Sequence, residues 1–194
     1  MQQVLTEVTT HVPEFGLIDC SRLRVSASYN RSPRRRGLLA YVLPLKYKDG
    51  SPVQTKTRGG KTLHFGIIPT IVDGKEILYI IYFMLPRFMN LSFRDKIETI
   101  IHELYHINPI FNGDLRRLKG RSYIHGNSLK EYDLKIKELA DRFLDSPYKT
   151  EVFEFLRHPF HKIEEKYGKV WTAHIPEPRP KLIHVQRNEK SGNL

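Results

Sequence analysis

The chain has 194 residues, of which 40% are hydrophobic and 11% aromatic, enough to bury the core of one folded domain. No apolar run reaches the roughly 18 residues that a membrane-spanning helix needs, and the N-terminus shows neither the basic nor the apolar segment of a secretory signal. The single cysteine, Cys20, excludes an intrachain disulfide and a cysteine-based zinc ribbon. We therefore expect a cytoplasmic protein with no membrane partner.

The net charge of +11 is high, and such an excess often marks proteins that bind nucleic acid. The basic residues are spread over several segments, among them RSPRRRG, KTRGGK, RRLKGR and the C-terminal tail. No nucleic-acid-binding motif accompanies them. A solvated, solubilising surface is the ordinary interpretation, and nucleic acid is the alternative partner.

The first half of the chain favours β-structure. Residues 22–29 alternate apolar and polar side chains, which is typical of a half-buried strand. Residues 37–47 form a second strand candidate. Pro44 should place the end of this strand at the edge of a sheet or at a bulge. The polar run QTKTRGGKT, residues 54–62, predicts a loop.

The segment LHFGIIPTIVDGKEILYIIYFML, residues 63–85, predicts two strands joined at Asp73-Gly74, a common hairpin dipeptide. After residue 90 the apolar period changes from two to 3.6. Ser92 can cap a helix there, and Pro109 prevents much continuation. We expect a helix over about residues 93–107, with an apolar stripe of Ile97, Ile100, Ile101 and Leu104.

A loop should follow, and Ser128 with Glu131 then forms a second capping box, which opens a helix over residues 128–144. One or two helical pieces broken at Pro159 come next. The chain should end in an extended basic tail with a late strand at 182–186. Strands followed by helices predict an α+β fold, with a single domain over 1–175 and the tail over 176–194.

The sequence HELYH lies on the first of these helices and has the pattern of a zinc site. His102 and His106 are four residues apart, so both side chains project from one face. Two imidazoles in this arrangement can bind one ion at about 2.0–2.1 Å. Glu103 is rotated about 100° from His102 and can face a metal-bound water as its general base.

A catalytic zinc usually has three protein ligands and one open position, so a third ligand should come from downstream. His125 is our first candidate, because the adjacent Gly126 lets the backbone pass closely. Asp114 is the rival, although a turn residue or a partner for a neighbouring arginine is its more ordinary role. Glu138 on the next helix is a weaker candidate.

The run HELYHINPIFNGDLRRLKGRSYIHG resembles the zincin metallopeptidases, most closely a phage-type metallopeptidase family with a Gly-Asp-Leu-Arg-Arg segment and a closing His-Gly. More distantly it is similar to SprT-like proteases, which act on proteins attached to DNA. The resemblance covers about a sixth of the chain. It implies a zincin-like fold, in which a mostly antiparallel N-terminal sheet packs on the motif helix and on further C-terminal helices. It also implies zinc ligation by His102, His106 and His125, with Glu103 as the base.

Four further residues have candidate roles. Tyr123 could donate a hydrogen bond to the oxyanion of a tetrahedral intermediate. Glu98, one turn before His102, could orient that imidazole. Arg116 and Arg117 could bind a substrate carboxylate, but we favour them as anchors of the loop through Asp114.

Together these features predict a zinc-dependent metallopeptidase that hydrolyses a protein or peptide substrate through a zinc-bound water activated by Glu103. Two alternatives stay open. One is a basic nucleic-acid-associated protein with a structural zinc, and the other is a zinc hydrolase of non-peptide substrates, because the motif specifies a nucleophile and not the bond that it attacks.

Overall fold

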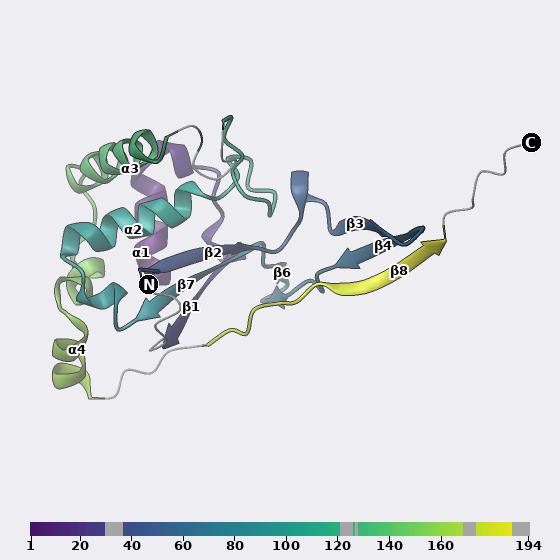
Figure 1. Ribbon diagram of the computed structural model, residues 1–194. Coiled ribbons are helices and arrows are strands. Elements are labelled where there is room, and N and C mark those ends of the chain that lie inside the picture. The colour runs from purple at the N-terminus through teal and green to yellow at the C-terminus, as the bar shows by residue number, and fades with distance from the viewer. Residues whose placement is uncertain (30–36, 121–125, 127, 169–173, 188–194) are drawn as a thin grey trace, which may run out of the picture.

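The computed structural model describes residues 1–29, 37–120, 126, 128–168 and 174–187. Its centre is a three-stranded sheet with the strand order β1-β7-β2 (Figure 1). Strand β1 (Leu23–Tyr29) runs parallel to β7 (Tyr79–Leu85), and β2 (Ala40–Pro44) runs antiparallel to it. Helices cover this sheet, which confirms the predicted α+β class. The parallel β1–β7 pair is the exception among the described strand pairs, and the sequence did not predict it.

Strand β7 is the middle of the fold, and all seven of its residues are buried. Because side chains alternate across a strand, one set faces the helices and the other faces away. The second set packs with Leu45 and Ile77 on the far side of the sheet, where Ile175 contacts it. The Ile175 amide donates to the Ser26 hydroxyl at 3.0 Å, so the segment after residue 174 crosses this far face.

The helical layer packs against the other face through one large apolar cluster. Its α-helices are α1 (Gln2–His11), α2 (Phe93–Tyr105), α3 (Leu129–Leu144) and α4 (Phe160–Tyr167). Short 3-10 turns connect the elements: η1 (Pro13–Phe15), η2 (Cys20–Arg22), η4 (Lys48–Gly50), η5 (Phe88–Asn90) and η6 (Thr150–Arg157). None of the described helices is long and apolar enough to span a bilayer.

The predicted caps set the starts of α2 and α3. The Ser92 hydroxyl accepts from the Asp95 amide at 3.1 Å, and the Ser128 hydroxyl accepts from the Glu131 amide at 3.3 Å. These contacts satisfy amides that have no partner inside the helix. Both helices therefore begin where the sequence predicted, and α2 ends at Tyr105, two residues before the predicted end.

The loop predicted at residues 54–62 is wrong. Strands β3 (Val53–Arg58) and β4 (Lys61–Gly66) form an antiparallel hairpin there. Its turn is Gly59-Gly60, with φ of 57° and 70°, values that glycine adopts without a steric penalty. The late strand predicted near the C-terminus is β8 (Lys181–Arg187), which pairs antiparallel with β4.

Of the two strands predicted over residues 63–85, the turn at Asp73-Gly74 is confirmed, but the strands are not continuous. The segment divides into β4, a small hairpin and β7, each with different partners. The hairpin is β5 (Ile71–Val72) with β6 (Lys75–Glu76), and its turn is the predicted Asp73-Gly74. A proline at position 69 precedes β5, and this residue cannot donate to a strand ladder.

Candidate metal centre

The two motif histidines converge at the C-terminal end of α2. The Nε2 atoms of His102 and His106 lie 2.9 Å apart. Two nitrogens bound at 2.0–2.1 Å in a tetrahedral site would be about 3.3 Å apart, so a small ring rotation suffices for both to bind one ion. The paired, converging imidazole nitrogens thus fit two positions of a zinc site.

Glu103 lies beside this pair and is buried, with 5% of its surface exposed. A cleft of about 510 Å³ opens at this point, lined by Glu103, His102, residues 37–40 and the α3 residues Asp133, Ile136 and Lys137. Burial raises the pKa of Glu103 to about 8, and a hydrogen bond from the backbone of Val42 offsets part of this rise. A carboxyl group with a strongly raised pKa at a cleft wall is a candidate for proton transfer.

Tyr132 of α3 holds the second histidine, a role that the sequence did not reveal. Its hydroxyl lies 3.2 Å from His106 Nδ1, and the two rings stack at an interplanar angle of 22°. When Nε2 is a ligand, Nδ1–H can donate to this hydroxyl and fix the ring. Burial raises the pKa of Tyr132 above its usual range, so the phenol stays protonated. It belongs to the apolar stripe of α3, where a tyrosine is indistinguishable from a core residue.

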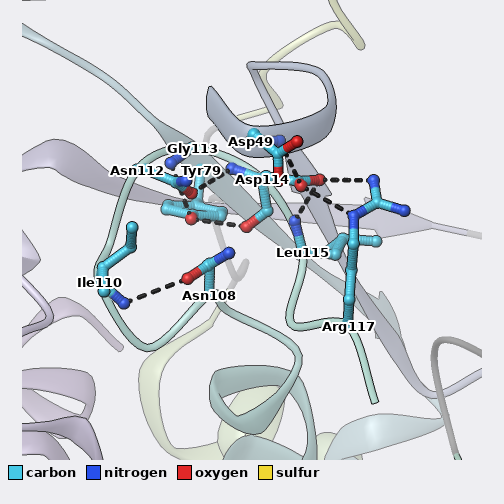
Figure 2. Close-up of polar contacts among 9 residues, drawn as sticks. All are labelled: Asp49, Tyr79, Asn108, Ile110, Asn112, Gly113, Asp114, Leu115 and Arg117. Atoms are coloured by element: carbon cyan, nitrogen blue, oxygen red, sulfur yellow. Dashed lines mark hydrogen bonds and ion pairs between the residues drawn. The ribbon is translucent and has the colours of Figure 1, made fainter. Parts of the chain in front are cut away.

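Asp114, the rival ligand, is surrounded by donors in the loop after α2 (Figure 2). Its carboxylate accepts from the backbone amides of Asp49 at 2.9 Å and Leu115 at 2.8 Å. The Arg117 guanidinium donates to both carboxylate oxygens at 3.0 and 3.1 Å. With only 3% of its surface exposed, Asp114 is an anchor of this loop, and Arg117 has the anchoring role that the sequence favoured.

The backbone around Asp114 is held as firmly as its side chain. The buried Tyr79 hydroxyl of β7 donates to the Asp114 carbonyl at 2.7 Å and accepts from the Gly113 amide at 2.9 Å, as Figure 2 shows. These bonds attach the loop directly to the central strand. The loop that leaves α2 therefore has a fixed path for its first turn.

Arg116 does not anchor Asp114, contrary to the prediction. Its Nε donates to the Tyr105 carbonyl at 2.7 Å, and its guanidinium lies 4.1 Å from the centre of the Tyr105 ring. Its own amide donates to the His106 carbonyl at 2.7 Å. Arg116 thus satisfies carbonyls at the C-terminus of α2, where a cation is favoured, and fixes the end of the helix that carries the histidines.

The remaining candidates fall into two groups. Tyr123 and His125 lie outside the described residues. Glu98 lines the cleft and accepts from Arg94 Nε at 2.9 Å, and Glu138 pairs with Lys135 at 3.1 Å on the exposed side of α3. Among the described residues, no three His, Cys, Asp or Glu side chains form a group that could hold a metal ion. Neither Asp114 nor Glu138 therefore completes the histidine pair.

Comparison with protein-family models, with curated proteins and with solved structures finds no match to this chain. The evidence for a function of this chain is therefore the HELYH motif and the arrangement of the residues around it.

Proposed function

We propose that the chain is a zinc-dependent metallopeptidase with a zincin-like fold. The observation that carries the proposal is the convergence of His102 and His106 through their Nε2 atoms beside the buried Glu103, at the wall of a cleft. If the motif had arisen by chance, there would be no reason for a capped helix, a cleft and a buried carboxyl group to occur at the same place. Here all three occur together on α2.

In this proposal His102 and His106 hold the zinc ion, and His125 is the third ligand. When bound, zinc acts as a Lewis acid that lowers the pKa of water and polarises a carbonyl group. Tyr132 keeps the His106 ring in place through Nδ1, and Arg116 fixes the helix end behind it. The chain thus supplies a preorganised pair of ligands on a rigid element.

Glu103 is the proposed proton carrier. Its carboxylate accepts a proton from the attacking water and passes it to the leaving amine as the peptide bond breaks. Burial raises the pKa of Glu103 to about 8 in the metal-free protein, and a cation bound by the adjacent histidines would favour the carboxylate form that accepts the proton. Tyr123 is the proposed donor to the oxyanion.

The edge of the central sheet is the proposed place for the substrate. Strand β2 is an outer strand in the order β1-β7-β2, and its first residue, Ala40, lines the cleft together with His102 and Glu103. An extended peptide can add to such an edge through backbone hydrogen bonds. This arrangement would bring its carbonyl group to the histidine pair and favours a peptide over a compact substrate.

The direct test compares three variants in zinc-loaded protein with an unstructured protein such as casein as substrate. Glu103→Gln should retain zinc and lose activity by roughly 10²- to 10⁴-fold, the usual contribution of a general base. His102→Ala should lose both zinc and activity. Glu138→Gln makes the same chemical change on the exposed side of α3 and should leave activity unchanged.

Full activity in Glu103→Gln would overturn the mechanism. A wild-type protein that holds zinc tightly but hydrolyses no peptide would instead favour a structural zinc or a non-peptide substrate.

A further inference from the structure

A second sheet, formed by β3, β4 and β8, extends away from the helices (Figure 1). Its three strands contain five lysines and arginines, two histidines and no aspartate or glutamate. This composition is unlike that of the helices, where acidic and basic residues are interspersed. The sheet therefore brings together basic residues from two segments that are far apart in the sequence.

The strand register sorts these residues onto one face. Lys56 pairs with Leu63, and Leu63 pairs with Val185 on the other side. Cross-strand partners point to the same face, as do residues two apart along a strand. The same face therefore contains the Arg58–Lys61 pair and Phe65, which pairs with Gln54. We call this surface the basic face, defined by Lys56, Arg58, Lys61, Leu63, Phe65 and Val185.

The cations and Val185 of the basic face are exposed to solvent, whereas Leu63 and Phe65 are half-buried. Lys56, Arg58 and Lys61 are exposed, and no carboxylate of the described residues forms an ion pair with them. Val185 is 43% exposed. The Lys56 ammonium lies 5.7 Å from the centre of the Phe65 ring, so a cation and an aromatic ring occupy one site. Unpaired cations beside partly exposed apolar side chains suit a ligand that has both anionic and planar apolar parts.

We propose that the basic face binds single-stranded nucleic acid. Lys56, Arg58 and Lys61 contact successive phosphates, while bases pack against Phe65, Leu63 and Val185. A single strand fits better than a duplex because the apolar side chains lie among the cations, and only unpaired bases are free to contact them. An acidic peptide would match the charge but would leave the apolar residues without a partner. This binding surface goes beyond the proposed peptidase activity and does not depend on the metal centre.

The test measures fluorescence anisotropy of a labelled oligothymidylate with the full chain. Replacing Lys56, Arg58 and Lys61 together by Gln should weaken binding by at least about tenfold at moderate salt. The slope of log K against log salt should become shallower by about 2, because each phosphate contact contributes about 0.7 in single strands. The control replaces Lys130, Lys162 and Lys166, which are exposed on α3 and α4, and should change the affinity less than about twofold, since no contact is lost.

A second variant distinguishes the contribution of base stacking from that of the phosphate contacts. Phe65→Ala keeps every cation and should weaken binding by at least about fivefold, as the loss of one base–aromatic contact does. Equal losses in the two triple variants would overturn the proposal, because binding would then follow net charge alone. Tighter binding of a duplex or of a poly-glutamate peptide, or unchanged affinity of the basic-face variants, would overturn it as well.

Discussion

Two buried carboxylates lie eleven positions apart on either side of the end of α2, and their surroundings differ sharply. Asp114, with 3% of its surface exposed, accepts from two backbone amides and an arginine. Glu103, with 5% exposed, has the Val42 backbone as its donor, and its pKa rises to about 8. Two acidic residues of equal burial are thus held in opposite ways.

The difference indicates a structural role for Asp114 and a chemical role for Glu103. A carboxylate whose oxygens accept hydrogen bonds from several donors holds those neighbours in place. A buried carboxyl with few donors pays a desolvation penalty as the anion, which makes it a stronger proton acceptor. Asp114 therefore organises the loop after the helix, and Glu103 is the residue suited to move a proton.

The same chemical change at the two positions should give opposite results for stability. Asp114→Asn places an amide NH₂ against donors and removes the charge that faces Arg117, so the free energy of unfolding should fall by about 3 kcal/mol. Glu103→Gln removes a group that burial disfavours as the anion and should change that free energy by less than about 1 kcal/mol. Urea unfolding of the metal-free proteins measures both.

A larger loss from Glu103→Gln than from Asp114→Asn would reverse the assignment of the two carboxylates. If Asp114 anchors the loop and is not a zinc ligand, folded Asp114→Asn should also retain its zinc.

A variant of Tyr132 tests whether its hydroxyl group holds the His106 imidazole in position. Tyr132→Phe keeps the ring that stacks on His106 but removes the hydroxyl at Nδ1. Zinc affinity should fall by about tenfold, as is typical when a partner of a ligating histidine is lost. Competition with a chelator measures this affinity, and Tyr105→Phe, the neighbouring tyrosine on α2, is the matched control. An unchanged affinity in Tyr132→Phe would mean that the hydroxyl does not position the ligand.

The smallest expected effect concerns the cap of α2. Ser92→Ala leaves the Asp95 amide without its acceptor and should lower the free energy of unfolding by about 1 kcal/mol. Ser128→Ala makes the matched change on α3 and should cost a similar amount. Zinc affinity should be unaffected in both, because the histidines lie in the last turns of α2. A selective loss of zinc in Ser92→Ala would show that the helix start controls the site.

Local signals predicted α2 and α3, but they missed α1 and the contacts between distant segments. Ser92 and Ser128 define α2 and α3 because caps act within one turn. The Asp49 amide, which donates to the Asp114 carboxylate, is 65 positions away in the sequence, and no local pattern could reveal this contact. The β3–β4 hairpin escaped prediction because β3 is exposed and polar after Val53, so no apolar alternation marks it. Helix α1, rich in threonine and valine, is a poor helix former by propensity and is fixed by burial of Val4, Leu5 and Val8.

The most direct test of the central claim is the zinc content of purified wild-type, His102→Ala and Asp114→Asn proteins, measured by atomic emission. We expect about one zinc ion per chain in the wild type and in Asp114→Asn, and almost none in His102→Ala, because a site that loses one of its three protein ligands binds zinc far more weakly. Full zinc content in His102→Ala, or zinc lost from a folded Asp114→Asn, would contradict a metal centre built on the α2 histidines.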